Sequence, residues 1–268
     1  MKVLDLDMDY FLECDPTSIG ESQTCRLPEQ DYGHKVWDST RVRLFFEKNL
    51  GLSKSNKIKG RIIVGHNESI PFWEELIKKG NLIAPFEVIH VDSHADLGLG
   101  YSSWEYILNT LLQYPVKSRP KYNKYIDCFG KMNQEGIGDY LLFAIAYRWI
   151  SKLTYCANPN GDKNDYLWCI LKDFHENEIW DDPVENPIQL IHNPNMAFLG
   201  RNASDDDKKK YLDAGIKEPE VPMTIIPTVK DVQFSGDFDF ALLAQSPNYT
   251  PASADFIMDI FREYIEEI

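Results

Sequence analysis

Three potential metal ligands occur at every second position just after a predicted strand: Asp92, His94 and Asp96. The preceding apolar run, residues 88 to 91, is typical of a buried strand. Because alternate residues of an extended chain point to the same side, these three side chains can converge on one point. Two carboxylates and an imidazole at one point repel one another and lose hydration unless a cation lies between them. Oxygen-rich ligation with one imidazole suits Mn²⁺, Mg²⁺ or Fe²⁺ better than a structural zinc.

A second acidic series opens the chain, where Asp5, Asp7 and Asp9 alternate with apolar residues. The alternation predicts a strand, but a row of aspartates is a poor strand former and is unlike an ordinary exposed face. We therefore expect the C-terminal end of this strand to supply ligands rather than to face solvent.

A third strand, predicted over residues 61 to 65, leads into His66 and Glu68. Ligands bind at the carboxyl ends of strands in open parallel sheets, so three strand ends with such side chains predict one shared site. The set is large enough for two divalent ions that share carboxylates, and such a pair makes hydroxide available near neutral pH. The predicted reaction class is metal-assisted hydrolysis.

The elements that must position these residues alternate between strands and helices. We predict helices over residues 39–50, 71–79, 102–113, 139–155 and 251–268, and further strands over residues 166–171, 187–191, 223–226 and 238–244. This order predicts an α/β fold with three layers, α/β/α, around a mostly parallel sheet. No repeat or linker divides the chain, so residues 1–268 are expected to form a single domain. Residues 12–36, rich in breakers, predict a long loop that serves as a rim or lid.

The formal net charge of −14, from 42 acidic and 28 basic residues, bears on the partners. A surface of that sign repels phosphate, so we expect neither nucleic acid nor an anionic membrane as a partner. It favours a cationic substrate or a basic peptide, although acidity also serves solubility alone. The five cysteines form no Cys-x-x-Cys pair, and no signal peptide or membrane-length apolar run is present. A cytoplasmic, soluble protein is therefore expected, with no prediction of its oligomeric state.

The chemical landmarks carry a family resemblance. Residues 91–96, Val-Asp-Ser-His-Ala-Asp, resemble the Asp-x-His-x-Asp signature of the arginase and ureohydrolase superfamily. Residues 5–9 are similar to its Ser-x-Asp-x-Asp signature, and Gly65-His66 resembles the end of its Gly-Gly-Asp-His signature. Residues 244–247, Ala-Gln-Ser-Pro, are similar to its final Glu-x-Asn-Pro strand end. Because the Asp-x-Asp strand opens this chain, the arginase-like strand order looks circularly permuted, most like the atypical peptide arginases.

This resemblance implies an enzyme with two Mn²⁺ ions that converts arginine residues of a ribosomally made precursor peptide to ornithine and urea. In that family a bridging hydroxide attacks the guanidinium carbon. Asp96 corresponds to the residue that passes a proton to the leaving nitrogen. By position, one ion would be held by Asp7, His66, Asp92 and Asp96, and the other by Asp7, Asp9, Asp92 and His94.

Several further candidates are left open by the sequence. Glu68 is either a metal ligand, in an alternative register, or the carboxylate that pairs with the guanidinium group. Asp139 is a distant second candidate for a catalytic role, although helix capping explains it by default. Asp5, at the family's serine position, and Gln245, where the family has its glutamate, are candidates for substrate binding. The family's shuttle histidine has no clear counterpart, and His34 in the long loop is the first candidate.

Other interpretations compete with a peptide arginase. An amide hydrolase of the deacetylase type uses similar ligands around one zinc, and a ureohydrolase acting on free arginine or agmatine uses the same centre. A phosphatase of the haloacid-dehalogenase type also opens with Asp-x-Asp, but it leaves residues 92–96 without a role. A peptide-binding module stabilised by an ion, or a solvated turn with a chance spacing, would have no catalytic activity.

Overall fold

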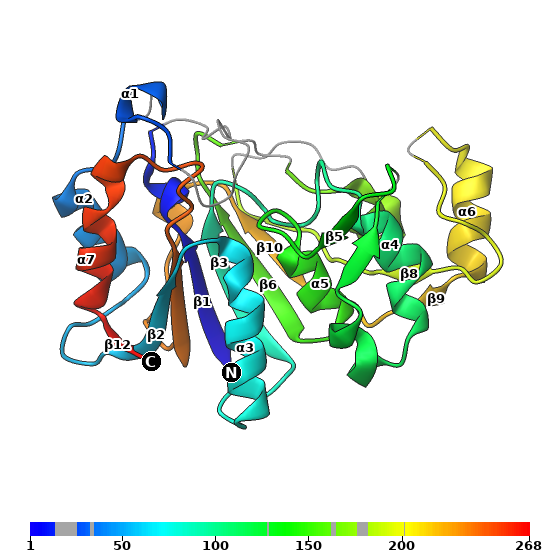
Figure 1. The fold of residues 1–268 in the computed structure, drawn as a ribbon, viewed down its shortest axis with the longest axis horizontal. Coiled ribbons are helices and arrows are strands. Elements are labelled where there is room, and N and C mark those ends of the chain that lie inside the picture. The colour runs from blue at the N-terminus through cyan, green and yellow to red at the C-terminus, as the bar shows by residue number, and fades with distance from the viewer. Residues whose placement is uncertain (14–25, 33–34, 128, 162–164, 176–181, 201) are drawn as a thin grey trace.

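A mostly parallel sheet runs through the middle of the molecule (Figure 1). The computed structural model describes residues 1–13, 26–32, 35–127, 129–161, 165–175, 182–200 and 202–268. The eight strands lie in the order β12-β2-β11-β1-β3-β6-β10-β7. Their bounds are β1 Lys2–Asp7, β2 Ile58–Ile63, β3 Phe86–Asp92, β6 Ile150–Ala157, β7 Val184–Glu185, β10 Met223–Ile226, β11 Phe240–Ala244 and β12 Ile265–Glu267. All neighbours in this sheet are parallel except β10 and β7.

The helices are short and lie around this sheet. They are α1 Glu29–Tyr32, α2 Ser39–Leu44, α3 Ser69–Lys78, α4 Ser103–Asn109, α5 Tyr140–Ala146, α6 Asp205–Ala214 and α7 Phe256–Arg262. Two antiparallel pairs stand apart, β4 Lys124–Ile126 with β5 Met132–Gln134, and β8 Ile191–His192 with β9 Ile216–Lys217. In the described part of the chain, no helix has the length and apolar character needed to cross a membrane.

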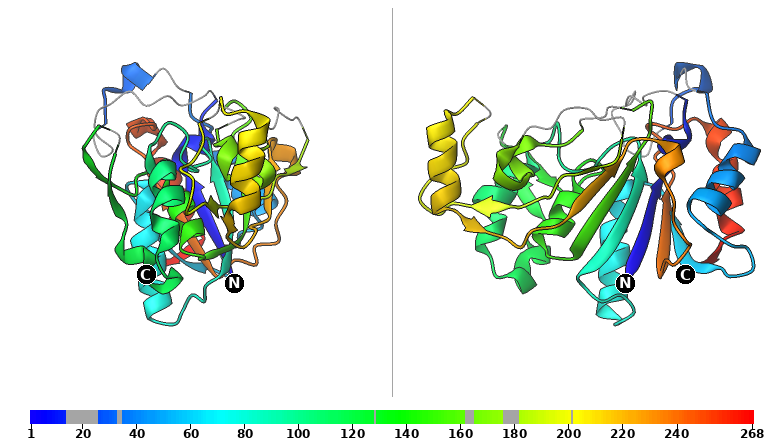
Figure 2. Two further views of the ribbon diagram at one scale, coloured as in Figure 1. Left: turned by 90° about the vertical axis from the view of Figure 1, so that its right-hand side faces the viewer. Right: turned by 180° about the vertical axis from the view of Figure 1, so that it is seen from behind.

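Apolar residues on the two faces of the central strands belong to two separate cores. One core joins Val3, Val88 and Leu242 to Trp73 of α3 and Phe143 of α5. The other core joins the alternate strand residues to α2 and α7, among them Leu4, Ile89, Leu243, Val42, Ile257 and Phe261. Helices therefore cover both faces, as Figures 1 and 2 show, and the prediction of an α/β fold with a mostly parallel sheet flanked by helices is confirmed.

Two predicted helices are wrong over their second halves. In place of a helix over residues 139–155, α5 ends at Ala146, Arg148 adopts a left-handed φ of 60°, and β6 begins at Ile150. Every residue of α5 and most of β6 are buried, so the apolar pattern is nearly continuous and cannot separate helix from strand. The predicted helix over residues 251–268 ends at Arg262, and β12 then pairs with β2, which would otherwise be an open sheet edge.

The strands predicted over residues 166–171 and 187–191 are also wrong. Trp168–Ile170 forms a 3-10 helix, and Ile188 makes only isolated bridges, to Leu171 and Val221. Short apolar stretches of this kind carry too little pattern to fix their conformation. By contrast, the strands predicted over residues 223–226 and 238–244 correspond to β10 and β11. Residues 14–25 and 33–34 of the predicted long loop, including His34, lie outside the described residues.

Candidate metal centre

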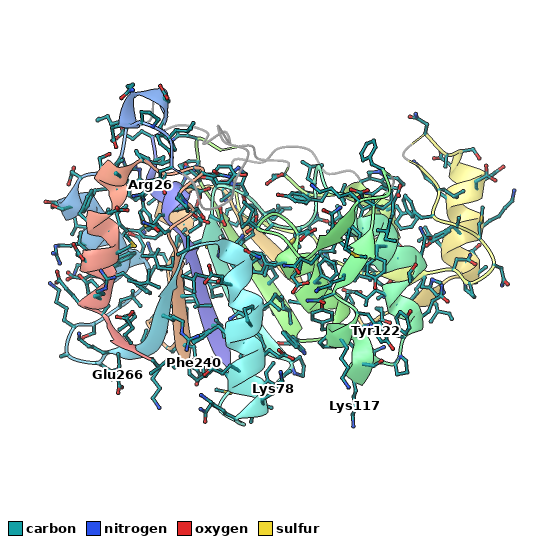
Figure 3. All side chains as sticks on the ribbon, viewed as in Figure 1. Arg26, Lys78, Lys117, Tyr122, Phe240 and Glu266 are labelled. Carbon is teal, nitrogen blue, oxygen red and sulfur yellow. The ribbon has the colours of Figure 1, made fainter. Side chains whose placement is uncertain are left out.

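The predicted ligands gather at one edge of the sheet, where β1, β3 and β11 end. Arg26 lies near this edge in Figure 3, whereas Phe240 and Lys78 mark the opposite edge. The parallel register sets Asp7 of β1 beside Ala244 of β11, and Leu6 beside Val91 of β3. Side chains that follow these positions therefore meet above the sheet, as the sequence predicted.

One group of ligands surrounds the imidazole of His66. Its Nδ1 atom lies 2.9 Å from Asp92 Oδ2, 3.1 Å from Asp7 Oδ2 and 3.2 Å from Asp96 Oδ2. All four side chains are buried, and the most exposed of them, Asp96, is 6% exposed. Asp96 also has a left-handed φ of 52°, a strained conformation for a residue other than glycine. The structure thus brings together the four residues assigned to the first ion.

A second group shares Asp92 with the first. His94 Nδ1 lies 3.0 Å from Asp9 Oδ2 and 3.8 Å from Asp92 Oδ1. Because Oδ2 of Asp92 faces His66 and Oδ1 faces His94, this carboxylate lies between the two groups. Both Asp7–His66–Asp92 and Asp9–Asp92–His94 have ligand atoms close enough to hold a metal ion. The six predicted metal ligands therefore form one cluster with two overlapping sites.

Unpartnered atoms within the cluster test whether it fits a metal. Both ring nitrogens of His66, Oδ2 of Asp92 and Oδ2 of Asp96 are buried and make no hydrogen bond. Each buried polar atom left without a partner costs about 1–3 kcal/mol. These atoms lie beside one another, so one cation among them satisfies several at once. The donor set, mostly carboxylate oxygen with imidazole, fits Mn²⁺, Mg²⁺ or Fe²⁺.

The charges inside the cluster are unbalanced. Burial, followed by the charges of the neighbouring carboxylates, raises the pKa of Asp92 well above its usual range. Burial by itself lowers the pKa of His66, but Asp5 and the other surrounding carboxylates outweigh it and raise the pKa well above the usual value. Both shifts have the same origin, an excess of buried negative charge, and this excess favours a bound cation.

Asp5 lies behind His66 rather than in the open part of the site. Its Oδ1 lies 3.3 Å from Nε2 of His66 and accepts a hydrogen bond of 3.0 Å from Ser69. Its Oδ2 accepts a hydrogen bond of 2.5 Å from the hydroxyl of Tyr140. A carboxylate behind a metal-binding imidazole fixes the ring and its tautomer. Asp5 is fully buried and does not line the cavity, so its position fits a supporting role rather than the predicted substrate binding.

Other supporting contacts come from residues that the sequence analysis did not name as candidates. The hydroxyl of Ser246 donates to Asp7 Oδ2, and Ser246 itself has a left-handed φ of 46°. The backbone N–H of Ser93 donates to Asp9 Oδ1 over 3.2 Å. Nε2 of His90, a residue of β3, lies 2.9 Å from the carbonyl oxygen of His94. No local pattern could connect Ser69 and Tyr140 with Asp5, because their helices, α3 and α5, are distant from Asp5 in the sequence.

A narrow cavity of about 130 Å³ leads from the surface to the cluster. Besides the six ligands, its walls include apolar residues, Leu97, Leu99 and Ile137, and the side chains of Tyr101 and Tyr249. Asp165 also lines it, and its Oδ2 accepts the backbone N–H of Ala95 at 3.0 Å. The sequence analysis did not single out Asp165. A narrow cavity with apolar walls and an acidic floor suits a slender cationic group.

Glu68 and Gln245 are not brought to this cavity. Glu68 is exposed, and its Oε1 accepts the backbone N–H of Gly65 at 3.0 Å. This capping box turns the side chain back onto its own helix start and away from the ligands. Gln245 points to another partner, because its Nε2 donates to Asp255 Oδ1 over 3.2 Å. The structure therefore shows no contact between either side chain and the cluster.

Asp139 lies just behind the cavity wall formed by Ile137 and Gly138. It is fully buried, its Oδ1 accepts the backbone N–H of Gly136 at 2.6 Å, and its Oδ2 makes no hydrogen bond. Burial raises the pKa of Asp139 to about 7, and the charge of Asp96 adds to this shift. Although Asp139 precedes α5, it makes no side-chain capping bond to that helix. It is thus close to the centre but outside the cavity lining.

Comparisons with known proteins add no relative to this picture. No protein-family model matches the chain, and no curated protein or solved structure matches it. The function therefore has to be argued from the geometry and charge of the site.

Proposed function

We propose that the chain is an arginase-like hydrolase with two metal ions that removes the guanidine group from arginine residues in a peptide, giving ornithine and urea. Four overlapping groups of described residues have ligand atoms close enough to hold a metal ion, and two of them include His90. The observation that carries this proposal is the other pair, Asp7–His66–Asp92 and Asp9–Asp92–His94, whose members all line the cavity and share one carboxylate. A structural ion site would need only one such group. A shared carboxylate between two groups is the arrangement that a two-metal hydrolase uses.

The cluster divides into two ligand sets. The proposal places one Mn²⁺ on Asp7, His66, Asp92 and Asp96, and the other on Asp7, Asp9, Asp92 and His94. When bound, two such ions make hydroxide available near neutral pH. The supporting residues act on the ligands themselves, since Asp5 holds the His66 ring and Ser246 holds Asp7.

Substrate recognition follows from the charge of the cavity. An arginine side chain stays cationic at any working pH, and its planar fork pairs with carboxylates. Asp165 is the acidic residue that lines the cavity in addition to the six ligands, among the described residues. We assign to Asp165 the guanidinium contact that the sequence analysis gave to Glu68. The apolar walls, Leu97 and Ile137, pack against the methylene groups of the arginine and exclude bulk water.

The reaction adds one water molecule to the guanidinium carbon and breaks its bond to the side-chain nitrogen. The water oxygen remains on the carbon, which leaves as urea, and a proton is transferred to the departing amine of ornithine. Asp96 lines the cavity beside the ligands, and we assign to its carboxylate the delivery of that proton.

Two measurements on Mn²⁺-loaded protein test this function. The expected result is two metal ions per chain, and a loss of about 42 Da per arginine in a peptide, with one urea released for each. Removal of an acetyl group also lowers the mass by about 42 Da, so an arginine peptide without acetyl groups is compared with a matched acetyl-lysine peptide. Loss of mass from the acetyl-lysine peptide, with one Zn²⁺ per chain, would instead support a deacetylase. Metal binding without any product would support a binding module.

The variant Asp165→Asn separates recognition from metal binding. The amide oxygen of the new asparagine can still accept the hydrogen bond from the backbone N–H of Ala95, but the negative charge at the cavity lining is lost. We expect the metal content to be unchanged and KM for the arginine peptide to rise about tenfold. Glu68→Gln, on the exposed capping box, is the matched control and should leave KM unchanged.

A further inference from the structure

A second, wider groove opens beside the cavity of the metal centre. Its volume is about 390 Å³, against about 130 Å³ for the cavity. Tyr101 lines both, so the groove and the cavity adjoin at this side chain. The ring of Tyr101 lies against Gly138, where a Cβ atom would come within 2.4 Å of it. Only glycine at position 138 lets this ring pack at the boundary between the two spaces.

Exposed aromatic and apolar side chains flank this groove. Phe129, at the tip of the hairpin formed by β4 and β5, is 91% exposed, more than any other large apolar side chain described. Ile126 and Met132 of the same hairpin are 65% and 60% exposed but do not line the groove, because they alternate with Tyr125 and Asn133, which do. Trp104 and Tyr125 complete the aromatic lining. Aromatic side chains gathered along one groove, with one of them open to solvent, mark an interaction surface, whereas single exposed residues are ordinary.

The turn that presents Phe129 is held in a fixed shape. Oδ1 of Asp127 accepts the backbone N–H groups of Phe129 and Lys131, at 2.9 and 2.8 Å. Its Oδ2 accepts the side-chain amide of Asn133 at 2.7 Å. These bonds order the turn before any ligand arrives, which lowers the entropy lost on binding.

The polar part of the groove is acidic. Glu105 and Asp127 both line it, and no lysine or arginine of the described chain does. Glu105 is exposed and forms no ion pair with any described residue. Carboxylates next to aromatic rings attract lysine and arginine side chains through charge and through the ring faces.

We propose that this groove holds the peptide segment next to the reacting arginine, with an apolar side chain on Phe129 and a basic side chain beside Glu105. The inference rests on the proposed function and answers a question that it leaves open, because a free amino acid fills the narrow cavity alone. Because Tyr101 lines both spaces, a peptide whose arginine enters the cavity would have its neighbouring residues beside the groove. The enzyme then acts on basic, aromatic peptides rather than on free arginine.

The test uses a fluorescein-labelled peptide, Phe-Lys-Gly-Arg-Gly-Lys-Phe, and N-acetylarginine amide as the short substrate. Peptide binding to Mn²⁺-loaded protein is measured by anisotropy, and urea release is measured for both substrates. Phe129→Ser should weaken peptide binding about tenfold and leave urea release from N-acetylarginine amide unchanged. Ile83→Ser is the matched control, because Ile83 is 67% exposed and precedes β3 at the opposite edge of the sheet.

A second variant tests the charge. Glu105→Gln should weaken binding of this peptide about fivefold and have no effect on a version with both lysines replaced by glutamine. If wild type, Phe129→Ser and Glu105→Gln bind the peptide equally well, the proposal that the groove holds the peptide is overturned, even if urea is released. Absence of urea from both substrates overturns the proposed function, while the anisotropy result still decides whether the groove binds the peptide.

Discussion

Two clusters of buried charge in this molecule differ in how they are balanced. In one, Glu218 accepts from Arg119 Nη2 and from Arg148 Nε, each at 2.7 Å. Three more guanidinium N–H groups of Arg119 donate to the carbonyls of Tyr114, Ala146 and Leu112. The other is the candidate metal centre, in which five carboxylates, Asp5, Asp7, Asp9, Asp92 and Asp96, surround three imidazoles, His66, His90 and His94.

The difference separates a structural network from a binding site. Around Arg119 and Glu218 every charge has a partner within the chain, so the network is complete on folding. At the candidate metal centre, buried polar atoms of His66, Asp92 and Asp96 lie within ion-pair distance of one another but make no hydrogen bond, and carboxylates outnumber imidazoles. A buried charge imbalance persists in a folded protein when a ligand completes it. The following four predictions test this contrast.

The largest effect is expected for Asp92→Asn, which removes the charge that both ligand groups share. Urea release should fall at least about 1,000-fold, and bound metal should fall below one ion per chain. Because the change relieves repulsion among buried carboxylates, the metal-free variant should be no less stable than the metal-free wild type. Metal analysis and urea denaturation of metal-free protein measure this. A metal-free variant several kcal/mol less stable would show that the cluster is already balanced.

Glu218→Gln should have the opposite profile. Arg119 is 3% exposed, so removing its carboxylate partner leaves a buried charge unpaired and should lower the free energy of unfolding by about 3 kcal/mol. Metal content should not change. Glu220→Gln is the matched control, since its pair with Lys172 is at the surface and should contribute less than about 1 kcal/mol. If Glu218→Gln and Glu220→Gln lower the free energy of unfolding equally, Glu218 is not part of a buried structural ion-pair network.

An intermediate effect is expected for Asp5→Asn, which keeps the shape of the side chain but removes the charge behind His66. Metal affinity should fall about 10- to 100-fold, because the imidazole loses the group that orients it. Tyr140→Phe removes the 2.5 Å hydrogen bond to Asp5 and the longer 3.5 Å contact with His90, but keeps the charge of Asp5, and should give a smaller loss of metal affinity. Titration with Mn²⁺ in competition with a chelator measures both. Unchanged affinity in Asp5→Asn would make this carboxylate purely structural.

The smallest effect concerns pH. Burial opposes the charge of Glu218, but Arg119 and Arg148 outweigh it and hold its pKa below the usual value of 4.5. Its contribution to stability is therefore fully present above pH 4.5 and is lost as the pH falls through the lower pKa of the folded state. The difference in unfolding free energy between wild type and Glu218→Gln should stay constant from pH 7 to pH 5 and narrow at lower pH. A difference that grows on acidification would contradict this sign.

The residues of the centre could be identified from the sequence to the extent that their signal is local. Asp92, His94 and Asp96 stand two residues apart after a strand, so their convergence follows from the strand period. Asp7 and Asp9 were found for the same reason. The local pattern also predicted strands β1, β3, β10 and β11, because alternation or an apolar run of strand length is visible in the sequence itself.

The remaining features depended on packing between distant segments. The supporting roles of Ser69, Tyr140 and Ser246 arise only when α3, α5 and β11 meet β1 in the fold. Asp165 enters the cavity from a loop with no motif. Glu68, two residues from a ligand, is turned away by a hydrogen bond to Gly65 that its type and spacing did not reveal.

By itself the sequence determined an α/β chain with aspartate and histidine side chains at the ends of its strands, because strand period and residue type act over a few positions. Only the tertiary structure decided where residues 139–155 change from helix to strand, since both segments are buried and equally apolar. It also decided that Asp92 faces both ligand groups and that a groove adjoins the cavity. These are properties of the distances between segments, and such distances are set by the packing of the whole core.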